Sequence, residues 1–113
     1  MALLSKRQIF DADDRKFEDV QCPEWGGDVR VRGLTAYEQS VISRLVFEDK
    51  KSEVALKIVQ FGCIDAEGEP LFTRDDLNEL KKKSFTVIER LTERISKLTG
   101  TGSEEEIEAA RKN

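Results

Sequence analysis

The segment from Cys22 to Thr35, CPEWGGDVRVRGLT, constrains the fold of this chain more than any other part of the sequence. Valine and arginine alternate from Val29 to Arg32, and apolar and polar residues alternate from Asp19 to Cys22, which is the two-residue period of half-buried strands. Gly26 and Gly27 lie between the two runs and predict the centre of a hairpin turn, because primed turns need a positive φ that glycine tolerates. The apolar face of this hairpin is then made of Val20, Cys22, Val29 and Val31.

A turn centred on Gly26 and Gly27 places Cys22 opposite Val31. Because a two-stranded ribbon is only marginally stable alone, the hairpin must pack on other elements. Apolar residues recur at helical spacing through most of the chain after Leu34, which indicates helices. The sequence therefore predicts an α+β fold: a mainly helical small domain with one N-terminal β-hairpin packed on a bundle of about four helices.

Capping patterns predict where the helices begin. Ser5 and Gln8 form a weak capping box for a short opening helix, and Thr35 with Glu38 forms a clear one for a helix that ends near Phe47. The stripe expected on this second helix consists of Tyr37, Val41, Ile42, Leu45 and Val46.

Capping residues also predict where the helices of the second half of the chain begin and end. We expect Ser52 to cap a central core helix, Thr73 to begin a short helix and Ser84 to cap a last strong helix that Gly100 ends. The apolar positions of that last helix are Phe85, Ile88, Leu91 or Thr92, Ile95 and Leu98. Beyond it, Ile107 is the only large apolar residue, and ordering costs about 1–2 kcal/mol per residue. We therefore expect a single domain over residues 1–99 and a weakly structured segment over residues 100–113.

Composition narrows the classes of function. The chain has 113 residues, of which 38% are hydrophobic and 37% charged, so its core is small and its surface strongly hydrated. Its net charge of −4 makes nucleic acid a poor partner, since phosphate contacts dominate that affinity. No apolar run approaches the roughly 20 residues of a membrane span, and Lys6 and Arg7 follow the first apolar residues at once, so no signal peptide is expected. These features predict a protein of the reducing cytosol.

The sequence also argues against catalysis and metal binding. It contains no histidine, no phosphate-binding glycine loop, and no acidic cluster with the spacing of a calcium loop. Cys22 and Cys63 have no visible base partner and lie among apolar residues, so we expect both to be reduced and buried. The prediction is a non-enzymatic interaction domain without cofactor or metal.

Four apolar side chains exceed what a small core requires and are the candidate partner-binding residues: Trp25, Tyr37, Phe47 and Phe61. Each of them is also compatible with a place in the core. Trp25 in particular either caps one end of the core or serves as an exposed anchor for a partner, and the first interpretation is favoured.

The order of these motifs resembles one known family. A short opening helix, a strand ending in PEWGG, a second strand VRVRGLT, a following helix and the later run CIDAEGEPLFT are similar to the short form of the tail assembly chaperones of long-tailed bacteriophages. The similarity covers roughly Leu4 to Leu98, and its motifs are structural rather than catalytic.

The resemblance implies a function and a set of partners. Such proteins bind the tape-measure protein in the host cytoplasm, keep it soluble during tail assembly and are absent from the finished particle. Tail-tube subunits and further copies of the chain itself are additional partners to be considered. The alternative is a structural tail or head–tail joining protein of the particle.

Overall fold

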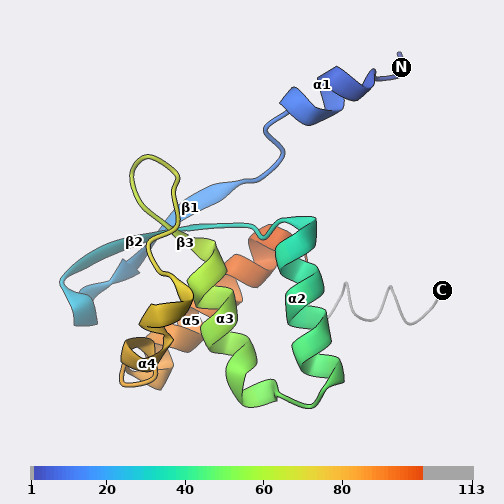
Figure 1. Ribbon diagram of the computed structural model, residues 1–113. Helices are drawn as coiled ribbons and strands as arrows, with labels where there is room; N and C mark the ends of the chain where they lie inside the picture. Colours follow the sequence, from blue (N-terminus) through green and yellow to red (C-terminus); the bar gives the residue numbers. More distant parts are fainter. Residues whose placement is uncertain (1, 101–113) are drawn as a thin grey trace.

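A three-stranded antiparallel sheet and five α-helices form the α+β architecture of residues 2–100, the part of the chain that the computed structural model describes (Figure 1). The predicted fold class is confirmed. The strands lie in the order β1-β2-β3. In chain order the elements are α1 (Lys6–Asp11), β1 (Phe17–Cys22), the 3-10 turn η1 (Pro23–Trp25), β2 (Gly27–Arg32), α2 (Ala36–Phe47), α3 (Lys51–Gly62), β3 (Cys63–Ile64), the 3-10 turn η2 (Arg74–Asp76), α4 (Leu77–Leu80) and α5 (Phe85–Thr99).

One core joins the inner face of the sheet to α3 and α5, and both helices lie beneath the strands in Figure 1. The predicted hairpin face is confirmed, with Val20, Cys22 and Val31 buried and Val29 packed against them. The remaining buried members of the core come from helices and from β3: Ile42, Ile58, Val59, Cys63, Leu80, Val87, Ile88, Leu91 and Ile95.

The predicted turn centre is wrong, although the predicted face is right. Cys22 pairs with Gly27 rather than with Val31, and the chain reverses through the 3-10 turn Pro23–Trp25. Gly26 closes that turn with a φ of +84°, whereas Gly27 has no positive φ and belongs to β2. The expected and observed partners of Cys22 are four residues apart, an even shift, so every side chain keeps the face that the alternating pattern assigned to it.

A short third strand was not predicted. β3 pairs antiparallel with β2, so that Cys63 lies beside Val31 at the end of α3. Just before it, Gly62 touches α5 so closely that a Cβ atom there would come within 2.8 Å of Ile95 Cγ1. This contact lets α3 and α5 approach beneath the sheet. Cys63 and Cys22 are both free and buried, as predicted.

The predicted capping residue of α3 is wrong. The capping boxes at Ser5 and Thr35 are confirmed, but α3 begins at Lys51 after Lys50, so Ser52 lies inside the helix. The connection between α2 and α3 is short and turns tightly at Asp49, which has a φ of +60°. The helix α3 therefore begins one residue before Ser52.

At the start of α5 the apolar stripe is displaced from its expected position. Ser84 precedes the helix but its side chain makes no capping hydrogen bond, and Phe85 is 73% exposed. Val87 takes the inward position instead, because Ile88, Leu91 and Ile95 fix the side of the helix that faces the core. Gly100 ends the helix with a φ of +94°, as expected.

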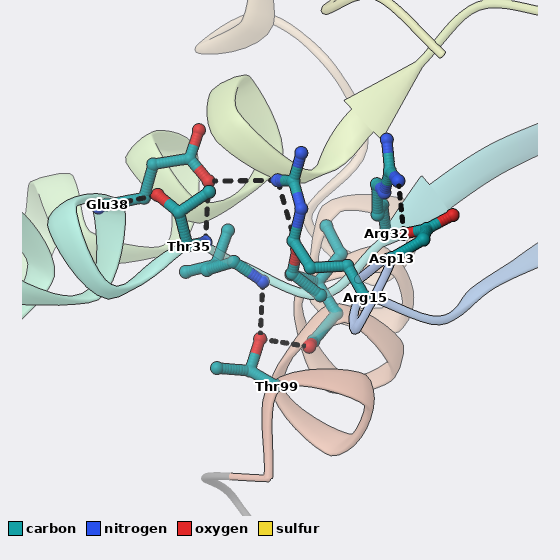
Figure 2. Close-up of polar contacts among 9 residues, drawn as sticks. Asp13, Arg15, Arg32, Thr35, Glu38 and Thr99 are labelled. Atoms are coloured by element: carbon teal, nitrogen blue, oxygen red, sulfur yellow. Dashed lines mark hydrogen bonds and ion pairs between the residues drawn. The ribbon is translucent and has the colours of Figure 1, made fainter. Parts of the chain in front are cut away.

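The junction between β2 and α2 is held by polar contacts from three parts of the chain (Figure 2). Arg15 donates to the Gly33 carbonyl at 3.5 Å and lies 3.6 Å from the Glu38 carboxylate, while Asp13 pairs with Arg32 at 3.1 Å. From α5, the Thr99 hydroxyl accepts the backbone N–H of Leu34 at 3.0 Å. The segment that leads into β1 is therefore fixed to the body, whereas α1 before it projects away (Figure 1).

The expected domain limits stay a prediction. Residues 101–113, on which the expectation of a weakly structured C-terminal segment falls, lie outside the described residues.

Candidate functional site

An apolar groove runs between α2, α3 and α4 and is here called the α2 groove. Its apolar lining consists of Val41, Leu45, Leu56 and Leu77, and its volume is about 230 Å³. The helices meet there because α3 lies between α2 and α4 (Figure 1). Since α2 sends only Ile42 fully into the core, its neighbouring apolar side chains remain accessible along the groove.

Charged side chains surround this apolar floor. Lys57, Arg74 and Lys81 contribute three positive charges to the rim, against one negative charge from Glu53. Lys57 is held in place, because its Nζ donates to Gln60 Oε1 at 2.9 Å and lies 5.2 Å from the centre of the Phe61 ring. The groove is thus locally basic in a chain whose net charge is −4.

The apolar surface continues along α2 beyond the groove. Tyr37 precedes Val41 and Leu45 at intervals of four residues, which places the three side chains on one side of the helix. Tyr37 is 74% exposed, and Phe47 at the end of the same helix is 91% exposed. A contiguous exposed apolar patch commonly marks a site of protein association, and Tyr37 extends the row of Val41 and Leu45 toward such a patch.

The four predicted partner-binding residues do not form one cluster. Phe61 is half-buried against the core and touches the groove through Lys57, and Tyr37 extends the groove along α2. Phe47 is exposed on another side of α2. Trp25 is half-buried at the hairpin tip, where it packs against the core and lines a separate groove, and its use as a partner anchor stays a prediction.

Sequence reasoning missed the residues that form the floor of the α2 groove. The sequence predicts that Val41 and Leu45 belong to a helical stripe, without assigning that stripe to a groove. A stripe that faces the core and a stripe that faces a groove have the same spacing. The two kinds of stripe are distinguished only in the packed structure, where Ile42 is the one fully buried residue of α2.

The ionisable groups outside the groove act structurally. Arg90 donates to both carboxylate oxygens of Glu24, at 2.9 and 2.7 Å, and these hydrogen bonds lower the pKa of Glu24 to about 2. Arg94 binds Glu18 in the same way and lowers its pKa as well. Both pairs join α5 to the hairpin.

The thiols are not arranged as nucleophiles. Burial raises the pKa of Cys63 to about 12 and raises that of Cys22, so both stay protonated at neutral pH. Within residues 2–100 no three histidine, cysteine or acidic side chains come close enough together to hold a metal ion. None of the helices in that range is both long and apolar enough to cross a bilayer.

Comparison with known proteins identifies the fold. No protein-family model and no curated protein sequence matches the chain. Among solved structures, the tail assembly chaperone of bacteriophage HK97 is similar over 86% of this chain and 95% of its own, with a TM-score of 0.66 and 18% sequence identity. The chain therefore has the fold of a phage tail assembly chaperone. The resemblance seen in the sequence motifs is confirmed at the level of the fold.

Proposed function

We propose that this protein is a phage tail assembly chaperone that binds the tape-measure protein in the host cytoplasm and keeps it soluble during tail assembly, without catalysis. The fold shared with the HK97 tail assembly chaperone supports the class. The observation that carries the binding role is the accessible apolar floor of the α2 groove, continued by Tyr37 along α2.

The groove suits a helical partner. An amphipathic helix binds a groove through apolar side chains at intervals of three and four residues, and the floor presents aliphatic side chains from three helices. The basic rim of Lys57, Arg74 and Lys81 favours a partner helix with acidic residues beside its apolar stripe.

The two components of the site respond differently to salt. Arg74 and Lys81 on the rim are exposed and Lys57 is partly exposed, so these charges are screened over about 10 Å at 0.1 M salt, and salt should mainly slow association. The apolar floor is insensitive to this screening, so mild salt should weaken the complex only a little. Because one small domain covers a short part of a long helix, several copies should bind each partner chain.

Co-expression with the tape-measure protein encoded nearby tests the proposal. The wild-type chain should keep that protein soluble and co-purify with it. Tyr37→Asp should reduce both, because it places a charge on the apolar row beside the groove. Phe85→Asp is the matched control, since an aromatic side chain of nearly equal exposure, 73% against 74%, is replaced by the same residue on α5. Equal solubility of the partner with and without this chain, and no co-purification, would reject the chaperone role.

A structural tail or head–tail joining protein is the alternative. Quantitative detection of the chain in purified particles decides between them. Stoichiometric amounts in the finished particle would replace the chaperone proposal with the structural one. Binding to tail-tube subunits, a secondary interaction in the chaperone proposal, would then become the principal one.

A further inference from the structure

Lys57, on the rim of the α2 groove, does not form the ion pair that its own helix offers. Glu53 precedes it by four residues, which is the favourable spacing and order for a glutamate and a lysine on a helix. On α5 the same arrangement gives an ion pair, in which Lys97 Nζ lies 3.4 Å from Glu93 Oε1. Within residues 2–100 Glu53 has no ion pair, and the Lys57 ammonium is directed toward the next turn of α3 instead. A contact other than the local charge therefore sets the direction of the Lys57 side chain.

Two side chains on that next turn hold the ammonium. Lys57 Nζ donates to Gln60 Oε1 at 2.9 Å and lies 5.2 Å from the centre of the Phe61 ring, within the ~6 Å range of cation–π attraction. Residues three and four positions apart share one side of a helix, so both contacts act on the same ammonium. The rotamer freedom of Lys57 is thereby reduced before any partner binds.

Gln60 is suited to fixing a neighbour in place. It is 9% exposed and is the one polar residue counted as buried in the described part of the chain. Burying an amide costs free energy unless the amide is hydrogen-bonded, and the bond to its Oε1 comes from Lys57. Because the Gln60 side chain is enclosed, its oxygen has a fixed position, and the Lys57 ammonium is fixed with it.

The other two cations of the rim lack this support. Arg74 and Lys81 are exposed, and within residues 2–100 neither side chain makes a hydrogen bond or an ion pair. Such side chains lose rotamer freedom when they meet a charged partner, and this loss offsets much of the attraction. Lys57 has already lost part of that freedom, so we expect it to contribute more to binding than Arg74 or Lys81.

The Lys57 ammonium still has capacity for an acceptor from outside. An ammonium carries more than one N–H, so the bond to Gln60 leaves others for a partner. Lys57 lines the groove next to Leu56 of its apolar floor. The complementary group is a carboxylate, because charge-assisted hydrogen bonds are stronger than neutral ones. A helix whose apolar stripe lies on the floor would bring a neighbouring acidic side chain to this ammonium.

We propose that Lys57 determines which helices the α2 groove accepts, by binding a carboxylate beside the apolar stripe of the partner, and that Gln60 and Phe61 are positioning residues that act through it. This inference rests on the proposed function and specifies the chemistry of its partner. Phe61, which the sequence predicts as an apolar partner contact, then serves binding through the lysine that it orients.

Two synthetic amphipathic helical peptides test the inference on the full-length protein. They share one leucine stripe and differ only beside it, where one has glutamate and the other glutamine. The wild type should bind the glutamate peptide at least ~10-fold more tightly in calorimetry at low salt. Lys57→Met keeps the length of the side chain and removes its charge, so it should abolish most of this preference. Lys81→Met is the matched control on the same rim and should retain most of it.

A second series tests the positioning role. Phe61→Leu keeps an apolar side chain but removes the aromatic face, so the preference for the glutamate peptide should fall about 3-fold. Phe61→Tyr keeps the ring and should restore the wild-type preference. A purely structural role of Phe61 would change the affinity for both peptides equally, so the ratio of the two dissociation constants separates the roles. An unchanged ratio in Phe61→Leu would overturn the positioning role.

The orientation of Lys57 can also be measured without any peptide. In the NMR spectrum of the free wild type, the ring current of Phe61 should shift the Cε methylene protons of Lys57 away from those of Lys81. Coincident signals would overturn the inference, and this readout decides if Lys57→Met does not fold.

Three binding results would also contradict the inference: no binding of the glutamate peptide, equal affinity of the wild type for both peptides, or an equal loss of preference in Lys81→Met and Lys57→Met. The tape-measure protein takes no part in these measurements. Failure of the co-expression test with the peptide preference intact would reject the proposed function alone, whereas the opposite result would reject only the role of Lys57.

Discussion

Helices α5 and α2 use the same kind of sequence pattern for different purposes. Both carry apolar residues at helical spacing, but α5 buries four of them, Val87, Ile88, Leu91 and Ile95, while α2 buries only Ile42. Two ion pairs from α5 to the hairpin reinforce its position: Arg94 pairs with Glu18 of β1 and Arg90 with Glu24 of the turn η1. No such pair from α2 to the sheet occurs in residues 2–100, where Glu38 forms its ion pair with Arg15, in the segment that leads into β1.

The comparison separates the part of the molecule that provides stability from the part available for binding. α5 lies under the sheet and contacts β1, β2 and α3, so most of its apolar stripe is used within the chain. α2 packs chiefly on α3 and leaves the rest of its stripe accessible beside the α2 groove. Substitutions on α5 should therefore affect unfolding, and substitutions on α2 should affect association.

The largest expected effect is the loss of stability when the same truncation is made on each helix. Leu91→Ala removes a fully buried side chain and should lower the free energy of unfolding by about 2–5 kcal/mol. Leu45→Ala on α2 removes a half-buried one and should cost roughly 1 kcal/mol. Urea unfolding of both variants measures the difference. Equal losses would mean that α2 is as much a part of the core as α5.

A smaller effect is expected where α5 meets α3. Gly62→Ala improves helix propensity but forces a Cβ atom against Ile95, and this overpacking should destabilise the protein by about 1–3 kcal/mol. Gly27→Ala is the matched control, because nothing lies within 4 Å of the added Cβ atom and φ is not positive. Thermal melting that shows Gly62→Ala as stable as the wild type would indicate a looser contact between the two helices.

The ion pair between α5 and the hairpin should make stability depend on pH. Hydrogen bonds from Arg90 lower the pKa of Glu24 from 4.5 to about 2 in the folded protein. The contribution of the pair is therefore complete above pH 4.5 and is lost as the pH falls toward 2. Glu24→Gln should flatten the fall in stability over this interval, measured by urea unfolding at a series of pH values. An unchanged pH profile would show that Glu24 and Arg90 do not interact in solution.

The smallest effect on stability is expected on the exposed side of α2. Phe47→Ser changes a side chain that is 91% exposed, so the free energy of unfolding should shift by no more than about 0.5 kcal/mol. Differential scanning calorimetry is sensitive enough to test this. A clear loss of stability would assign Phe47 to intramolecular packing and remove it from the accessible surface.

Local periodicity was sufficient to predict some features of the fold and not others. The face of the hairpin followed from alternation, because Val20 and Val31 keep their side of the sheet under any even shift of register. The register itself could not be predicted, since Gly26 and Gly27 both tolerate a positive φ and only the 3-10 turn that starts at Pro23 selects Gly26. β3 is two residues long and has no alternating pattern of its own.

The α2 groove could not be predicted from the sequence either, because it too depends on tertiary packing. The spacing of Val41 and Leu45 shows that one side of α2 is apolar, but it does not show how much of that side other helices cover. How much of that side is covered depends on where Leu56 and Leu77 lie, and tertiary packing brings these two residues beside α2. Of the predicted partner-binding residues, Tyr37 continues the row of Val41 and Leu45 along α2, and the sequence predicts it as one apolar residue more than the core requires.

Methyl NMR of the complex with a helical segment of the tape-measure protein tests most directly whether α2 provides the binding face. The methyl groups of Val41, Leu45, Leu56 and Leu77 report on the α2 groove, while those of Val87 and Leu91 report on the core beneath the sheet. We predict that binding shifts the four groove signals strongly and leaves the two core signals almost unchanged. If the partner binds to saturation but the groove signals do not move, and methyl signals elsewhere shift instead, the assignment of α2 as the binding helix is contradicted.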